Sequence, residues 1–200
     1  MDLSHTVRKI LGVLTLGLGI SFGQKIVHMN GTYDLDGDAL LEFIALELDP
    51  NKDVFPTTVR YYEIDADGYQ TLIWEFTPPL ALEGQFVDAQ IGDMDGDGSP
   101  ELVLVMNLSR FGDNATPHVF VATYSWDGAY FSELPSATLD VGKENRSLRC
   151  NNFQLLDQDA DGYQELVLAL GSPFRGFAIV NASPSGLSLT KKVRPNELLV

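Results

Sequence analysis

The chain has 200 residues, of which 44% are hydrophobic, 10% aromatic and 20% charged. This composition supplies enough apolar side chains for a folded core and excludes a disordered or collagen-like protein. The 13 basic residues against 28 acidic residues give a net charge of −15. Such a charge repels phosphate backbones and anionic lipid headgroups, so we expect neither a nucleic-acid partner nor a basic membrane-surface protein.

Residues 1–23 have the pattern of a secretory signal peptide. Arg8 and Lys9 precede an apolar stretch at residues 10–20, and Ser21 and Gly23 place small residues before a cleavage site near Gly23. The stretch is shorter than the roughly 18 apolar residues that a membrane span requires, so we expect no membrane span. The alternative is an amphipathic N-terminal helix of a cytosolic domain. The signal peptide predicts a secreted, periplasmic or cell-surface protein with a folded domain at residues 24–200.

Three acidic segments of similar sequence begin at Asp34, Asp93 and Asp157. They divide the domain into repeats of about 60 residues, roughly 24–83, 84–145 and 146–200. A short apolar run follows each segment, and then comes a predicted hairpin with a glycine-bearing turn. In chain order the apolar runs are 43–46, 102–105 and 166–169, and the hairpins are 59–76, 119–134 and 176–190.

Each repeat also has a strand leading into its acidic segment, as at residues 86–91, and so contains four short antiparallel strands. This arrangement predicts an all-β fold built from β-propeller blades. Three blades are fewer than the four of the smallest typical propeller, so we expect a partial or open propeller. Its exposed edges predict self-association or further blades that complete the ring.

The acidic segments follow the pattern D-x-D-x-D-G-x-x-E, with carboxylates at positions 1, 3, 5 and 9. Clustered carboxylate oxygens suit Ca²⁺ better than Zn²⁺, which prefers His and Cys ligands. An EF-hand requires a glutamate at position 12, where Ala45, Leu104 and Leu168 stand instead. The remaining alternative is a set of polar hairpin turns.

The sequence therefore predicts up to three Ca²⁺ sites. The first is the least certain, because Ala39 stands where a left-handed backbone would favour glycine. The side-chain candidates are Asp34, Asp36, Asp38 and Glu42 in the first segment, Asp93, Asp95, Asp97 and Glu101 in the second, and Asp157, Asp159, Asp161 and Glu165 in the third.

These segments resemble the FG-GAP/VCBS repeat family, whose blades also form the propeller of integrin α subunits. The third, at residues 157–173, is the most similar, with a calcium loop, a strand and a Gly-Ser-Pro ending. The resemblance implies Ca²⁺ ligation by the side chains at positions 1, 3, 5 and 9. It also implies a backbone carbonyl ligand at position 7, from Leu40, Ser99 or Tyr163.

The resemblance implies a calcium-stabilised binding or adhesion scaffold with a protein or glycan ligand. The alternative is an accessory propeller of a secreted hydrolase or lyase acting on polysaccharide or lipid. Only His28 and His118 remain after the predicted cleavage, neither in a nucleophile setting, and no G-x-S-x-G motif occurs. We therefore expect a protein that is not an enzyme.

Overall fold

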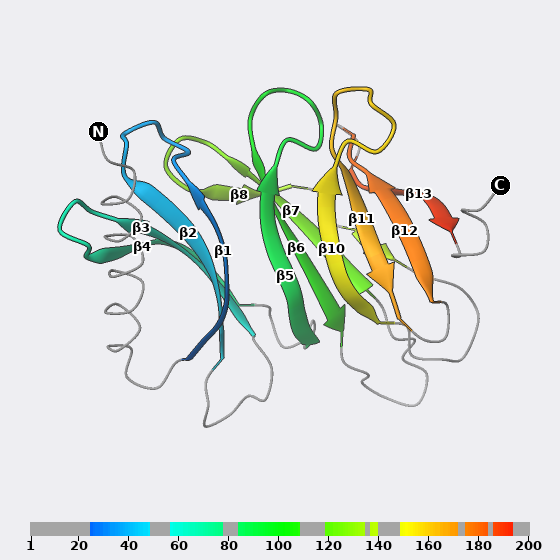
Figure 1. The fold of residues 1–200 in the computed structure, drawn as a ribbon, viewed down its shortest axis with the longest axis horizontal. Helices are drawn as coiled ribbons and strands as arrows, with labels where there is room; N and C mark the ends of the chain where they lie inside the picture. Colours follow the sequence, from blue (N-terminus) through cyan, green and yellow to red (C-terminus); the bar gives the residue numbers. More distant parts are fainter. Residues whose placement is uncertain are drawn as a thin grey trace, which may run out of the picture. The chain divides into compact units, whose positions relative to one another are not determined.

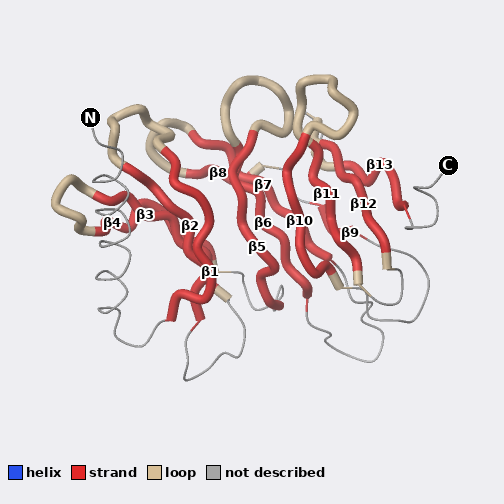
Figure 2. The backbone as a smooth tube through the Cα atoms, in the orientation of Figure 1, coloured by secondary structure: helices blue, strands red, loops and turns tan. Residues whose placement is uncertain are grey.

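The computed structural model describes residues 25–48, 57–77, 84–108, 119–134, 137–139, 149–171, 175–183 and 186–193. These residues form strands, turns and loops and contain no helix (Figure 2), which confirms the all-β class. None of them therefore belongs to a helix able to cross a membrane. The predicted signal peptide lies outside the described residues. The chain divides into two compact units, Met1–Phe76 and Thr77–Val200.

The first unit contains one antiparallel sheet with the strand order β1-β2-β3-β4. Strand β2 carries the predicted apolar run, and its residues 42–47 are all buried. A strand buried on both faces needs a continuous apolar run rather than an alternating one, which explains the pattern. The strands are β1 (Lys25–Tyr33), β2 (Leu41–Leu48), β3 (Thr58–Ile64) and β4 (Gln70–Phe76).

The second unit contains a second sheet, β5 to β9, and a third sheet with the order β10-β11-β12-β13 (Figure 1). The second sheet departs from four strands, because two short strands, β8 and β9, both pair with β7. Pro135 lies between them in the sequence and has no N–H to donate to a ladder. The strands are β5 (Gly84–Gly92), β6 (Glu101–Leu108), β7 (Val119–Trp126), β8 (Phe131–Glu133), β9 (Ala137–Leu139), β10 (Cys150–Leu156), β11 (Glu165–Leu170), β12 (Gly176–Asn181) and β13 (Ser188–Val193).

The second and third sheets share one hydrophobic core, so they pack as neighbouring blades do. Figure 1 shows β5 and β10 side by side. The second sheet contributes Met94, Val103, Val105, Val119 and Val121, and the third contributes Cys150, Phe153, Leu166, Leu168, Leu170, Ala178 and Val180.

Two amide side chains connect the second sheet to strand β10 through hydrogen bonds. Asn107 donates to the carbonyl oxygen of Cys150 at 2.9 Å and accepts from its N–H at 2.8 Å. Gln90 donates to the carbonyl of Phe153 at 3.0 Å and accepts from the N–H of Leu155 at 3.2 Å. Each amide side chain thus forms hydrogen bonds with backbone groups of strand β10. These bonds fix the position of the second sheet relative to the third.

Candidate metal centres in the acidic loops

Each predicted acidic segment joins the first two strands of its sheet. The first loop spans residues 34–40 between β1 and β2, the second spans 93–100 between β5 and β6, and the third spans 157–164 between β10 and β11. The glutamate at position 9 is the second residue of β2 or the first residue of β6 or β11. The sheets therefore hold each glutamate beside its own loop.

The loop backbones turn inward through left-handed residues at positions 4 and 6. Position 6 was predicted to require a positive φ, and Ala39 has φ of 69°. Position 4 requires it too, which the sequence analysis missed, and Ala160 occupies it in the third loop with φ of 62°. The other four positions are glycines: Gly37 (76°), Gly96 (75°), Gly98 (86°) and Gly162 (96°).

Backbone N–H groups hold the aspartates in place. In the second loop, Asp93 accepts from the N–H groups of Gly96 at 2.7 Å and Gly98 at 3.0 Å. Asp97 accepts from the N–H of Ser99 at 2.7 Å. Equivalent bonds join Asp157 to Asp161 and Gly162, Asp161 to Tyr163, Asp36 to Asp38, and Asp38 to Leu40.

The glutamate at position 9 makes the same contact in all three loops. Its carboxylate accepts the backbone N–H of position 2: Leu35 at 3.2 Å, Met94 at 2.7 Å and Gln158 at 2.8 Å. Glu42, Glu101 and Glu165 are only 2 to 3% exposed. A buried carboxylate requires a partner that compensates its charge, and one N–H supplies only part of this compensation.

Burial also changes the acidity of two of these glutamates. Burial is the largest of the effects that together raise the pKa of Glu101 to about 7; the Met94 N–H opposes it, and the nearby carboxylates of Asp95, Asp93 and Asp97 add to it. Burial likewise raises the pKa of Glu42. Crowded carboxylates of this kind repel one another, and a bound cation removes that repulsion.

The second loop gathers the complete predicted side-chain set. Asp93, Asp95, Asp97 and Glu101 each offer one carboxylate oxygen, and these oxygens all lie within 4.8 Å of one another. Such a group can hold a metal ion, and its all-oxygen donor set suits a hard cation such as Ca²⁺ or Mg²⁺.

The first and third loops gather three of their four predicted side chains. Asp34, Asp36 and Glu42 form one group, whereas Asp38 joins Asp36 and Glu63 in another. Asp157, Asp159 and Glu165 form the third-loop group, without Asp161. The backbone carbonyls of Leu40, Ser99 and Tyr163 stay predicted ligands.

Glu63 was missed because it lies on β3, outside the repeated motif. The register pairs it with Glu42 on the neighbouring strand. Burial and the charges of Asp38, Asp36 and Asp65 raise its pKa. The predicted hairpin at residues 59–76 could have indicated this residue, because a glutamate at the end of its first strand lies beside the acidic loop.

The second and third loops touch each other. The backbone N–H of Gln164 donates to the carbonyl oxygen of Asp93 at 3.3 Å. A Cβ atom on Gly96 would collide with the ring of Tyr163, so the ring lies directly on that glycine. Both loops lie at the same end of their sheets (Figures 1 and 2). The second and third loops are therefore in direct contact.

Fold and site together define a class: an all-β repeat protein in which every sheet carries an acidic loop able to hold a metal ion. Within that class, residues 34–104 match the model of the FG-GAP-like repeat family. Over these residues the match confirms the predicted resemblance to FG-GAP repeats. The matched segment runs from the first acidic loop through the second and into β6.

Two curated proteins of Bacillus subtilis (strain 168) are similar to part of the chain. Rhamnogalacturonan exolyase YesX is 31% identical over 86 residues, which are 40% of this chain and 13% of the lyase. Rhamnogalacturonan endolyase YesW is 33% identical over 86 residues, with the same coverage. The chain thus matches only about an eighth of either relative. No solved structure matches it.

Proposed function

We propose that this chain is a secreted, non-catalytic binding module whose loops hold Ca²⁺ for structural reasons and whose ligand is a polysaccharide. The observation that carries the metal part is the recurrence of one arrangement in three loops: a buried glutamate bound to the N–H of position 2, beside clustered aspartates. Polar hairpin turns have no need of a buried glutamate. A flexible oxygen cage of this kind favours Ca²⁺ over Mg²⁺, which keeps more of its waters.

Thermal unfolding with and without Ca²⁺ tests the metal proposal. A site filled at 100 times its Kd stabilises the folded state by about 2.7 kcal/mol, which corresponds to roughly 5 to 10 °C in a domain of this size. We expect Ca²⁺ to raise the melting temperature and EGTA to lower it, with a smaller effect of Mg²⁺. Identical melting in Ca²⁺ and EGTA, together with no calcium by elemental analysis, would exclude the metal sites.

A charge-only substitution makes the test specific to one loop. Asp95→Asn removes a predicted ligand charge but keeps an oxygen that accepts the N–H of Asp97, as Asp95 does at 3.2 Å. We expect weaker Ca²⁺ binding and a smaller thermal shift. Asp67→Asn is the matched control, because Asp67 is an exposed aspartate in the β3–β4 turn outside the acidic clusters.

The relatives support a polysaccharide as the ligand. Both are named for rhamnogalacturonan, and both share a segment with this chain. We expect the Ca²⁺-loaded protein to bind rhamnogalacturonan in affinity electrophoresis or calorimetry and to ignore dextran. If neither binds while the metal sites fill, the chain is a calcium-stabilised scaffold for another ligand, such as a protein.

A second candidate function is the accessory propeller of a polysaccharide lyase, which the similarity to two lyases favours. A β-elimination leaves an unsaturated sugar that absorbs ultraviolet light, so incubation of the protein with rhamnogalacturonan tests whether this chain is itself catalytic. We expect no increase in absorbance for this chain alone. An increase that disappears without the protein would replace the non-catalytic proposal with a lyase.

A further inference from the structure

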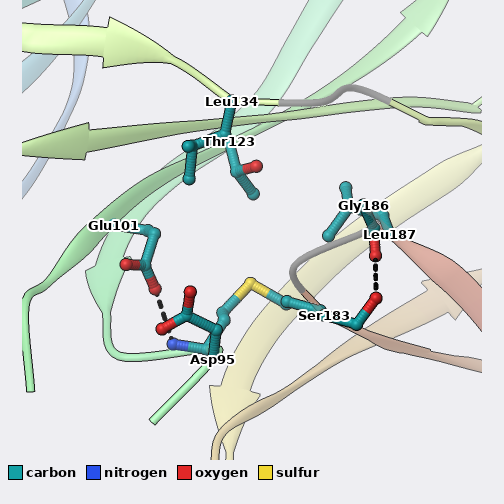
Figure 3. Close-up of a pocket in the computed structure, with 9 residues that line it drawn as sticks. Asp95, Glu101, Thr123, Leu134, Ser183, Gly186 and Leu187 are labelled. Carbon is teal, nitrogen blue, oxygen red and sulfur yellow. Dashed lines mark hydrogen bonds between the residues drawn. The ribbon is translucent and has the colours of Figure 1, made fainter. Parts of the chain in front are cut away.

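A small pocket lies beside the second acidic loop, between the second and third sheets of the second unit. Its volume is about 70 Å³, roughly twice the ~30 Å³ that one water occupies in the liquid. Figure 3 shows side chains from both sheets around it. The lining residues are Met94, Asp95, Glu101, Thr123, Leu134, Ala182, Ser183, Gly186 and Leu187.

Thr123 contributes a side-chain hydroxyl to the wall of this pocket. The residue is only 3% exposed, so the pocket is the space that this side chain faces. The nearby Ser183 hydroxyl donates to the carbonyl of Gly186 at 2.9 Å. A threonine hydroxyl can donate one hydrogen bond and accept two. The Thr123 hydroxyl can therefore hydrogen-bond to a group that enters the pocket.

The repeat register shows that a threonine is unusual at this position. The residue two places after each buried glutamate pairs with Tyr61 in the first sheet, Thr123 in the second and Ile179 in the third. Only in the second sheet is the paired residue small and polar. Val119 and Val121, on the same face of β7, pack in the core. Thr123 thus replaces a bulky side chain with a hydroxyl at the point where the pocket forms.

The lining chemistry selects the kind of group that fits. Asp95 and Glu101 disfavour an anion, and they accept hydrogen bonds from hydroxyl groups. Met94, Leu134 and Leu187 give the pocket an apolar wall. A sugar ring presents hydroxyls and C–H groups side by side, and a volume of two waters admits its edge but not the whole ring.

We infer that this pocket binds the edge of one sugar residue of the polysaccharide, with Thr123 and Glu101 hydrogen-bonded to its hydroxyls. The inference rests on the proposed polysaccharide ligand and assigns that ligand a place. Asp95 and Glu101 belong both to the pocket and to the metal group of the second loop. Filling of the metal site thus fixes two walls of the pocket before the sugar enters.

Calorimetric titration of the Ca²⁺-loaded chain with rhamnogalacturonan fragments tests the assignment. Thr123→Val keeps the shape of the side chain and removes the hydroxyl. One neutral hydrogen bond corresponds to about a 2- to 10-fold loss of affinity. Thr123→Ser retains the hydroxyl and should retain most of the binding. Ala182→Leu fills the pocket and should reduce binding more strongly than Thr123→Val.

The matched control is Thr71→Val on strand β4, an exposed threonine of the first unit. We expect it to bind as the unchanged protein does. The melting temperature of Thr123→Val is a second readout, and it should stay close to that of the unchanged protein, because the substitution keeps the shape of the side chain.

Three outcomes overturn the assignment. If Thr123→Val and Ala182→Leu bind the fragments normally, the sugar lies elsewhere and the proposed function survives. If the unchanged, Ca²⁺-loaded protein binds no fragment, the polysaccharide proposal fails together with the pocket. A lysine-containing peptide that binds in a Thr123-dependent manner would likewise replace the sugar with a protein ligand.

Discussion

Replacing Ala39 or Ala160 with glycine should stabilise the protein. Both alanines have a left-handed backbone, with φ of 69° and 62°. An L-residue with a Cβ atom pays for this conformation because the Cβ approaches the backbone carbonyl oxygen, whereas glycine adopts it freely. The other loop residues at positions 4 and 6 are all glycines.

The magnitude follows from two opposing effects. Relief of the left-handed conformation contributes roughly 1 to 2 kcal/mol. Glycine also makes the unfolded chain more flexible, which costs about 0.4 to 1 kcal/mol. The net gain is about 0.5 to 1 kcal/mol per substitution.

Urea unfolding in EGTA is the appropriate assay, because it removes the contribution of bound metal. Gly98→Ala is the reciprocal control: Gly98 has φ of 86°, and a Cβ atom there meets nothing within 4 Å. Its cost is therefore conformational only, and we expect a similar loss of stability. If Ala39→Gly and Ala160→Gly destabilise the protein while Gly98→Ala is neutral, the left-handed backbone does not strain these loops.

Three further outcomes follow from the structure. Gly96→Ala should cost more than Gly98→Ala in the same urea assay, because its Cβ would also displace the ring of Tyr163; equal losses would refute the contact between the two loops. Asn107→Ala should lower the free energy of unfolding by about 2 to 4 kcal/mol, since it leaves the buried N–H and C=O of Cys150 unpaired, and a loss below 1 kcal/mol would show that these bonds are not made. In EGTA, a pKa of Glu101 near 7 against about 4.3 in the unfolded chain means that the folded state binds the proton more tightly. The contribution of Glu101 to stability is therefore complete below about pH 4 and is lost as the pH rises through 7. The difference in unfolding free energy between the unchanged protein and Glu101→Gln should vary across this pH range. A constant difference would contradict the raised pKa.

The sequence predicted the strands and the acidic loops because both depend on local patterns. The apolar runs became β2, β6 and β11, and the glycine-bearing turns closed the predicted hairpins. The pattern of carboxylates placed Asp93, Asp95, Asp97 and Glu101 in one group as expected. Carboxylates at alternate positions come together when left-handed residues between them curl the chain. The local sequence is therefore enough to predict this group.

The features that the sequence did not predict depend on contacts between strands. Glu63 reaches the first loop through its cross-strand pairing with Glu42, and the contact between Tyr163 and Gly96 joins loops 67 residues apart in the sequence. The unusual character of Thr123 depends on the strand register, which aligns it with Tyr61 and Ile179. A single sequence records none of these neighbours.

Much of the negative charge behind the net charge of −15 lies in these loops. Twelve of the 28 acidic residues occupy positions 1, 3, 5 and 9 of the three segments. In the second unit, the second loop adjoins both the third loop and the pocket around Thr123. Cations that neutralise these carboxylates would therefore affect the contact between the second and third sheets as well as the loops. A cation bound there would also constrain Asp95 and Glu101 in the wall of the pocket, and it would thereby link the stability of the fold to the binding of the proposed ligand.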